Sequence, residues 1–479
     1  MKYLLAPLIL SHLAGARSED VRQRPLFPTD EHSFSENTID VFSLRHIFHH
    51  GTHLNPDLHK HFDISDSRST LWINSELDPE IGPKIEITRP LIASSSPVDI
   101  ERLQDRRPSV LEPLITAAQE GVNVWESASN QWALDTISGP NVTDKDTILT
   151  FAYMGANAYE PELNKGDWKD VGGGFNETEG FGWEKEGVRG YVYANEDEST
   201  VVISFKGGSA RFWNPWDTAW QDKENVNMLF GCCCGQGSFL YHRACNCAKG
   251  STCDISCVGS CLRKEEKYYA AAQQIYSNIT ALYPDSQIWL TGHSLGGTMS
   301  SLLGLTYGLP AITFETPGDA LPVSRLGLPA PPGSGTPQSR NNTGTFHFGV
   351  TSDPIFTGTC TGWTATCALA GYSFESTCHT GRKCVYDVMK DFGWHSSILS
   401  HGITSVIYDV LLRYETVPEC KAVPDCTDCS SWKEVSRNRT TTSMPSSSST
   451  STSTATCRTP GWFGGCWDKT TSATAIPTS

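Results

Sequence analysis

Apolar residues follow two different periods along the central part of the chain. Short, nearly continuous apolar runs are typical of buried strands, and they lie at 201–205, 287–291, 311–315 and 345–350. Between them are longer stretches with a helical apolar period, such as 264–283. Strands that alternate with helices predict an α/β fold built on a parallel sheet.

The junction between the run at 287–291 and the small-residue stretch at 295–308 reads Gly-His-Ser-Leu-Gly. The G-x-S-x-G pattern marks a sharp strand-to-helix turn, in which glycines two residues either side of the serine let strand and helix pack closely. The serine then sits at the N-terminus of a helix, which favours developing negative charge. Ser294 is therefore the predicted nucleophile, and the backbone N–H of Leu295 is a predicted oxyanion donor.

A second oxyanion donor is expected from a loop that follows an early strand. The sequence SFKGGS places Gly208 three residues after the run at 201–205. Glycine lets a backbone N–H approach a substrate closely because it has no side chain. The backbone of Gly208 is the predicted second donor, and an ordinary glycine turn is the alternative.

A serine nucleophile needs a base, and the base needs an orienting carboxylate. In this fold the chain order is Ser, then Asp or Glu, then His. Asp353 follows the apolar run at 345–350 and precedes a proline, so it is the predicted acid. Asp319 is the runner-up, and Asp387 and Asp391 lie in a less strand-like segment.

Two histidines compete for the role of base. His395 and His401 both adjoin a predicted helix start, whereas His347 precedes Asp353 and His379 lies among cysteines. The residues alone do not separate the first two, and we select His401.

Composition limits the protein's partners and its compartment. Lys and Arg total 37 against 53 Asp and Glu, a net charge of −16, which argues against nucleic-acid binding. Seventeen cysteines indicate an oxidising compartment, and their odd number implies at least one free or intermolecular thiol. Five N-x-Ser/Thr glycosylation sites agree with a secretory-pathway lumen, namely Asn141, Asn176, Asn278, Asn341 and Asn438.

The chain divides into four predicted segments. Residues 1–18 read as a signal peptide or signal anchor, and residues 19–147 as a polar leading region. An α/β-hydrolase domain is expected over 148–430, with a Cys-rich insertion at 230–262. Residues 431–479 form a Ser/Thr-rich low-complexity tail, which is predicted to be disordered.

Two further patterns have competing interpretations. His46 and His50 stand at the i, i+4 spacing of a helical metal site, but no Cys or carboxylate joins them within that stretch, so no metal is predicted.

Trp213, Trp216 and Trp220 follow a helical period after the oxyanion loop. They predict either an aromatic lid over residues 210–222 or ordinary core packing.

The motifs together resemble a known family. FKGG, PDSQIWLTGHSLGG, FGVTSDPIF and His401 resemble the class 3 lipases, which are α/β hydrolases. LRHIFHHGTH, FGCCCG, GHSLGGTMSSLLGLTYGLPAITFETPGDALP and the Ser/Thr tail are similar to the fungal autophagy-related vacuolar lipases. The resemblance implies that Ser294, Asp353 and His401 form the catalytic triad and that no cofactor is needed.

The resemblance also implies a biological role. It is that of a lipase or phospholipase which hydrolyses membrane lipids and triacylglycerol of intravacuolar vesicles. Delivery would run through the Golgi and multivesicular bodies as a single-pass type II membrane protein, with secretion if the N-terminus is cleaved. A secreted serine esterase for soluble or plant-wall esters and a non-enzymatic lipid-binding glycoprotein are the alternatives, and protein partners are unknown.

Overall fold

The computed structural model describes ten ranges of the chain: 38–51, 59–64, 71–73, 85–120, 122–128, 131–158, 169–170, 187–207, 219–264 and 267–435. The predicted signal segment and the tail from residue 436 onward lie outside these ranges, as do Gly208, Trp213 and Trp216. Within the described part of the chain, no helix is long and apolar enough to cross a bilayer.

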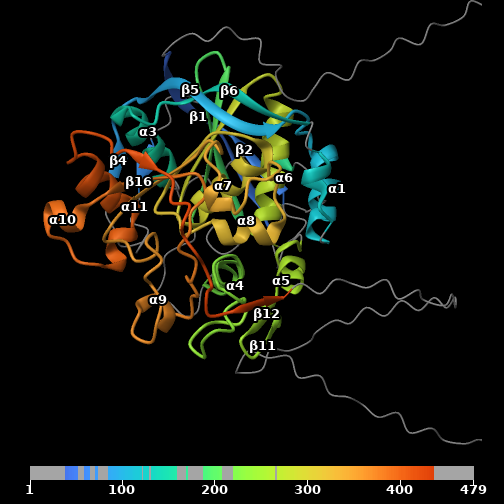
Figure 1. The fold of residues 1–479 in the computed structure, drawn as a ribbon. Coiled ribbons are helices and arrows are strands. Elements are labelled where there is room, and N and C mark those ends of the chain that lie inside the picture. Colours follow the sequence, from blue (N-terminus) through green and yellow to red (C-terminus); the bar gives the residue numbers. More distant parts are fainter. Residues whose placement is uncertain are drawn as a thin grey trace, which may run out of the picture. The chain divides into compact units, whose positions relative to one another are not determined.

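One large sheet forms the centre of the fold (Figure 1). The apolar runs expected to be strands all enter it, and the strands from β10 to β16 pair in parallel. β9 pairs antiparallel with β10, so the sheet is mixed. In sheet order the strands are β17 (Cys420–Lys421), β16 (Arg382–Tyr386), β15 (Thr345–Val350), β14 (Ala311–Phe314), β13 (Gln287–His293), β10 (Thr200–Phe205), β9 (Val188–Ala194), β1 (Ile39–His50), β2 (His59–Asp63) and β8 (Lys169–Asp170).

The sheet begins earlier in the chain than the predicted domain start at residue 148. β1 pairs with β9 inside the large sheet, and it also pairs with β5 (Leu91–Leu103), which pairs with β6 (Trp132–Pro140). The predicted boundary is therefore too late, because residues 39–50 bury apolar side chains against the sheet despite their polar neighbours. His46 and His50 lie on this strand, so the helical interpretation of their spacing is wrong.

Both faces of the sheet are covered, which explains the continuous apolar runs. Successive strand side chains point to opposite faces: Val201 and Ile203 enter one core, and Val202 enters the other. α7 packs on β13 and β14, and α3 packs on β13 and β5. The main helices are α1 (Pro108–Gln119), α3 (Lys145–Ala156), α4 (Ala219–Leu229), α5 (Ile255–Leu262), α6 (Tyr268–Leu282), α7 (Leu295–Tyr307) and α8 (Ala320–Leu326).

Short elements complete the described chain. Two small sheets stand apart from the large one, β4-β3-β7 and β11-β12-β18. The strands are β3 (Leu71–Ile73), β4 (Ile85–Ile87), β7 (Asn157–Ala158), β11 (Ala248–Lys249), β12 (Thr252–Asp254) and β18 (Lys433–Val435). The helical segments are α2 (Val124–Ser127), η3 (Pro337–Ser339), α9 (Thr366–Leu369), α10 (Val388–Phe392), η4 (Ile398–His401), α11 (Ile403–Ser405) and η5 (Val406–Leu411).

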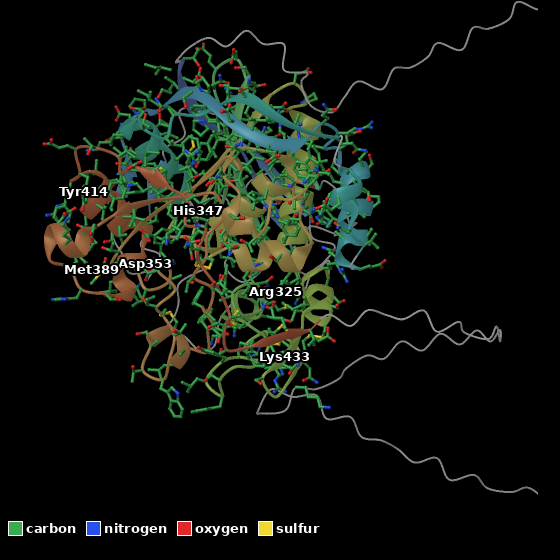
Figure 2. The ribbon with its side chains drawn as sticks, viewed as in Figure 1. Arg325, His347, Asp353, Met389, Tyr414 and Lys433 are labelled. Atoms are coloured by element: carbon green, nitrogen blue, oxygen red, sulfur yellow. A yellow bond between two sulfur atoms is a disulfide. The ribbon has the colours of Figure 1, made fainter. Side chains whose placement is uncertain are left out.

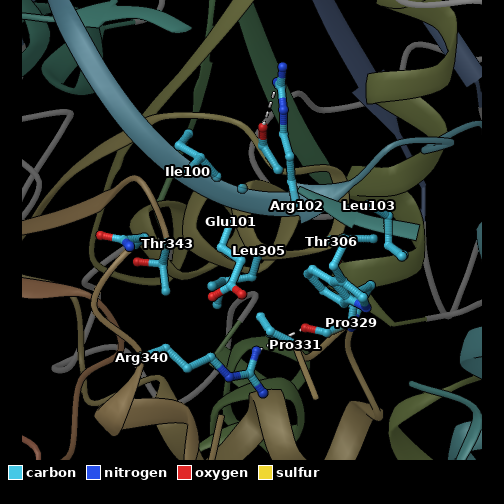
Figure 3. A pocket seen from close by; sticks show the side chains of 14 residues that line it. Ile100, Glu101, Arg102, Leu103, Leu305, Thr306, Pro329, Pro331, Arg340 and Thr343 are labelled. Carbon is cyan, nitrogen blue, oxygen red and sulfur yellow. Dashed lines mark hydrogen bonds between the residues drawn. The ribbon is translucent and has the colours of Figure 1, made fainter. Parts of the chain in front are cut away.

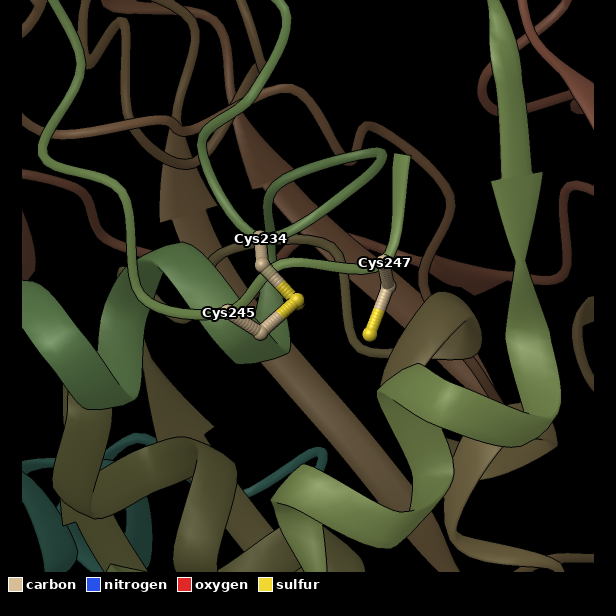
Figure 4. A group of neighbouring side chains, drawn as sticks. All are labelled: Cys234, Cys245 and Cys247. Carbon is tan, nitrogen blue, oxygen red and sulfur yellow. A yellow bond between two sulfur atoms is a disulfide. The ribbon is translucent and has the colours of Figure 1, made fainter. Parts of the chain in front are cut away.

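Disulfides fix the Cys-rich insertion and the C-terminal part of the domain. Figure 4 shows the bond between Cys234 and Cys245, with Cys247 beside it. Cys247 bonds Cys257. Among the described cysteines, Cys261 is outside a disulfide, which agrees with the odd count. The other bonds are Cys232–Cys429, Cys233–Cys253, Cys360–Cys367, Cys378–Cys426 and Cys384–Cys420.

Candidate active site

Ser294 occupies the sharp turn between β13 and α7. Its backbone has φ 54° and ψ −124°, a strained conformation for a residue with a side chain. A Cβ on Gly292 would stand 2.5 Å from the backbone carbon of Gly296, and a Cβ on Gly296 would overlap the carbonyl oxygen of Phe205. Both glycines are therefore required by close backbone packing, as the motif predicts.

The structure brings the three predicted triad residues together. The Oγ of Ser294 lies 2.8 Å from His401 Nε2, and His401 Nδ1 lies 2.7 Å from Asp353 Oδ2. Asp353, labelled in Figure 2, is fully buried, His401 is nearly so, and Ser294 is partly exposed. The hydrogen-bonded chain thus runs from a partly exposed serine to a carboxylate inside the fold.

Asp353 is held in the charged form despite its burial. Burial alone would raise the pKa of this carboxyl, but the charge of His401 and several hydrogen bonds outweigh it, so the pKa lies below its ordinary value. The backbone amides of Ile355 and Phe356 donate to Asp353 at 2.8 and 3.2 Å. A charged acid at this position can orient the imidazole of His401 and stabilise it when protonated.

A second buried carboxyl, Glu315, stands beside Asp353. It follows β14 directly, while Asp353 follows the neighbouring strand β15, so adjacent strand ends bring the two together. Burial, the charge of Asp353 and a hydrogen bond between the two side chains raise the pKa of Glu315 well above its ordinary value. A neutral Glu315 can donate its proton to Asp353 while its other oxygen accepts from the amide of Val350 at 3.3 Å.

Sequence reasoning did not identify Glu315 as part of the site. The residue ends the run AITFE, which predicts a buried strand and no catalytic role. The signal that was present is an acidic residue at the carboxyl end of a buried strand, one strand away from the triad acid.

The competing candidates lie elsewhere. His395 is exposed on the loop between α10 and η4. Asp319 bonds Ser301 and Thr380 at the start of α8, and His347 bonds Thr313 at 2.8 Å inside the sheet (Figure 2). These contacts are structural.

The predicted oxyanion donors are only partly described. Leu295 is the first residue of α7, where a backbone N–H has no acceptor within its own helix. Gly208 lies outside the described residues, but Gly207 stands against the nucleophile: a Cβ there would lie 3.4 Å from Ser294 Cβ. The amide of Lys206 donates to Arg189 O at 3.0 Å and is therefore occupied.

His293 holds the backbone of the base, His401, through a hydrogen bond. Its Nε2 donates to the backbone carbonyl of His401 at 2.7 Å, and the two rings are 4.9 Å apart. The residue before the nucleophile thereby fixes the segment that carries the imidazole. The motif pattern gave no signal for this contact, because that position admits any residue.

The pocket shown in Figure 3 is not the site of the triad. Its lining includes Gly304 and Gly308, at the C-terminal end of α7, whereas Ser294 precedes the N-terminal end. Glu101 and Arg340 stand in it, and the space admits little more than a water molecule.

The histidines of β1 and the clustered cysteines, which are the other candidate metal ligands, have structural partners. His46 Nδ1 lies 2.9 Å from Asp63, and His50 Nδ1 lies 2.8 Å from His59 Nδ1. The cysteines that gather within metal-binding range include Cys234, Cys245 and Cys247 (Figure 4), whose sulfurs are in disulfides. Of the glycosylation sites, Asn341 is exposed, Asn141 and Asn278 are partly exposed, and Asn176 and Asn438 lie outside the described residues.

These features define an α/β hydrolase of the class 3 lipase kind. A family model described as Phospholipase-like, a Tle-like phospholipase domain, matches residues 163–321. "Putative lipase atg15" of Penicillium rubens is 45% identical over 448 residues, which is 91% of this chain. "Putative lipase ATG15" of Passalora fulva is 46% identical over 442 residues, which is 90% of this chain.

The chain belongs to the family of these fungal autophagy-related lipases, and the predicted resemblance is confirmed. It spans 66% of the length of each of the two relatives. Lipase II from Rhizopus niveus is a structural neighbour at 13% identity and a TM-score of 0.22, covering 45% of this chain and 74% of that one. A triacylglycerol lipase from Penicillium expansum has 11% identity and a TM-score of 0.20, covering 42% and 65%.

Proposed function

We propose that the protein is a serine hydrolase that cleaves the ester bonds of membrane phospholipids and triacylglycerol. The observation that carries this proposal is the continuous hydrogen-bonded chain from Ser294 through His401 to Asp353. The family's lipase names and the phospholipase-like match at 163–321 support a lipid as the substrate.

The geometry supports acyl-enzyme chemistry. Ser294 Oγ attacks the ester carbonyl carbon while His401 Nε2 takes the hydroxyl proton, and Asp353 stabilises the imidazolium. The N–H of Leu295 and the Gly207–Gly208 loop stabilise the tetrahedral oxyanion. Collapse breaks the bond to the alcohol, which leaves with the proton from His401. Water then attacks the acyl-enzyme while His401 takes a proton from the water. The fatty acid leaves, and His401 returns the proton to the Ser294 oxygen.

The biological setting is part of the same proposal. Relatives that carry an autophagy-related name support a role in the breakdown of vesicle membranes inside the vacuole. The seven disulfides among the described residues support a lumenal location, because such bonds persist in oxidising compartments. N-terminal sequencing and membrane fractionation of the mature protein distinguish a retained anchor from a cleaved signal peptide.

Activity-based labelling tests the chemistry. A fluorophosphonate should label the wild-type protein at Ser294 and leave Ser294→Ala unlabelled. The unlabelled wild-type enzyme should hydrolyse phospholipid vesicles as well as short soluble esters, and labelling at Ser294 should abolish both activities. Hydrolysis of soluble esters alone would favour the secreted-esterase alternative, and absence of both labelling and turnover would favour a lipid-binding glycoprotein.

A further inference from the structure

Two aromatic rings stand out from the Cys-rich side of the protein. Phe239 is 79% exposed and Trp363 is 76% exposed, and their ring centroids lie 5.5 Å apart in an edge-to-face pair. Leu369, at the end of α9, is 65% exposed. We call these three residues the aromatic platform. Rings that meet each other yet remain open to water need a physical reason, because large exposed apolar groups gathered in one place mark interaction sites.

Each ring is carried by its own disulfide-closed loop. The bond Cys234–Cys245 encloses Phe239, and the bond Cys360–Cys367 encloses Trp363. α9 and the Cys-rich segment lie together at the lower edge of Figure 1. Two short covalent loops hold the rings in place before any partner arrives, so little conformational entropy is lost on binding.

Hydrogen bonds join the first loop to the segment that follows the second loop. The amide of His242 donates to the carbonyl of Gly371 at 2.8 Å. The side-chain amide of Asn227 donates to both of those residues' carbonyl oxygens, at 2.7 and 2.9 Å. Behind them, the rings of Phe230 and Phe374 stack at 5.8 Å. The aromatic platform therefore rests on a packed base rather than on two independent loops.

The charge of these loops differs from that of the rest of the chain. Residues 230–241 and 354–374 contain no Asp, Glu, Lys or Arg, although the protein carries a net charge of −16. The first Asp, Glu, Lys or Arg beyond Phe239 is the exposed Arg243. The carboxylate of Glu375 borders the first loop, where it accepts hydrogen bonds from the Cys232 amide and the Ser373 hydroxyl. Because the loops themselves carry no charged residue, they can approach lipid headgroups with little electrostatic repulsion, and aromatic rings favour the membrane–water boundary.

The aromatic platform is connected to the catalytic edge of the sheet. Residues 354–374 continue directly from Asp353, and the amides of Ile355 and Phe356 donate to its carboxylate. The triad acid and the loop that carries Trp363 therefore belong to one continuous segment of the chain.

We propose that Phe239, Trp363 and Leu369 form the surface with which the protein binds the lipid–water interface of its substrate. This inference rests on the proposed function, because it supplies the bilayer contact that a membrane lipase needs. The partner is a phospholipid bilayer surface, and binding places the rings among the headgroups while the disulfide-closed loops stay folded.

Vesicle binding tests the proposal separately from catalysis. The full-length oxidised protein is prepared with Ser294→Ala, so that lipid is not consumed, and mixed with phosphatidylcholine vesicles with or without phosphatidylserine. Phe239→Ser and Trp363→Ser should each lower vesicle affinity by about tenfold, which corresponds to the loss of about 55 Å² of apolar contact. In the Ser294 background, both variants should hydrolyse a short soluble ester at the wild-type rate.

Two leucines provide a matched control. Leu369 on α9 and Leu134 on β6 are similarly exposed, at 65% and 59%, and β6 lies at the opposite end of the ribbon (Figure 1). Leu369→Ser should weaken vesicle binding, and Leu134→Ser should leave it unchanged. Equal effects of the two, or unchanged binding in Phe239→Ser and Trp363→Ser, would overturn the proposal. So would a wild-type dimer that Trp363→Ser converts to a monomer with unaltered vesicle binding, since the surface would then join two copies of the chain.

Discussion

Replacing Glu315 by glutamine tests whether Glu315 is protonated in the folded protein, because glutamine can donate a hydrogen bond to Asp353 but cannot titrate. Burial and the neighbouring Asp353 raise the pKa of Glu315 above its ordinary 4.5, so the folded protein holds this proton more tightly than the unfolded chain does. The stabilisation is fully present below pH 4.5 and is lost as the pH rises through the folded pKa. Glutamine also donates to Asp353, but it does not ionise, so its contribution to the free energy of unfolding does not change with pH. Its advantage over the wild type in free energy of unfolding should therefore grow by about 1.4 kcal/mol per pH unit until the folded pKa is reached.

Denaturant unfolding of wild type and Glu315→Gln from about pH 5 to about pH 7 measures this difference. Groups shared by both proteins largely cancel in the comparison. Ester hydrolysis should be retained in Glu315→Gln, because the donor to Asp353 remains. Glu315→Leu should be less stable by about 1–3 kcal/mol, because the Val350 amide loses its acceptor. A stability difference between Glu315→Gln and wild type that stays constant with pH would refute a neutral, proton-donating Glu315.

Three further substitutions test the site. Ser294→Ala should lower ester hydrolysis by about 10⁶ without changing the Tm; near-normal turnover in the folded variant would refute the assigned nucleophile. His401→Ala should match it, whereas the exposed His395 should tolerate alanine, and the reverse pattern would mean that the base is misassigned. Gly296→Ala should lower the free energy of unfolding by about 1–3 kcal/mol through overlap with a backbone carbonyl. Gly155→Ala, inside α3 with neighbours only at 3.7 Å or beyond, should be neutral or stabilising, and similar losses in both would contradict the packing explanation.

The parts of the fold that sequence predicts well are those with local signals. The buried strands are continuous apolar runs, and the turn at Ser294 is specified by glycines that no other residue can replace. Asp353 could be selected because it follows such a run directly. In each case the physical constraint acts within a few residues of the position concerned.

The features that the sequence leaves open or misses depend on neighbours far apart in the chain. His395 and His401 stand in similar local sequence, and only the fold brings one of them to Ser294. Glu315 becomes part of the site because β14 lies next to β15, an order that the sequence does not state. His46 and His50 illustrate an ambiguity of spacing, since four residues also return a strand to the same face.

The disulfide between Cys232 and Cys429 closes a covalent ring that contains Ser294, Asp353 and His401. A protease that cuts once anywhere on that ring opens it into a linear chain but releases no fragment. The two pieces stay joined by the disulfide. The hydrogen bonds between Ser294, His401 and Asp353 do not require a continuous backbone. In a compartment rich in proteases, such a molecule can be nicked and still migrate as one species until a reductant separates the pieces.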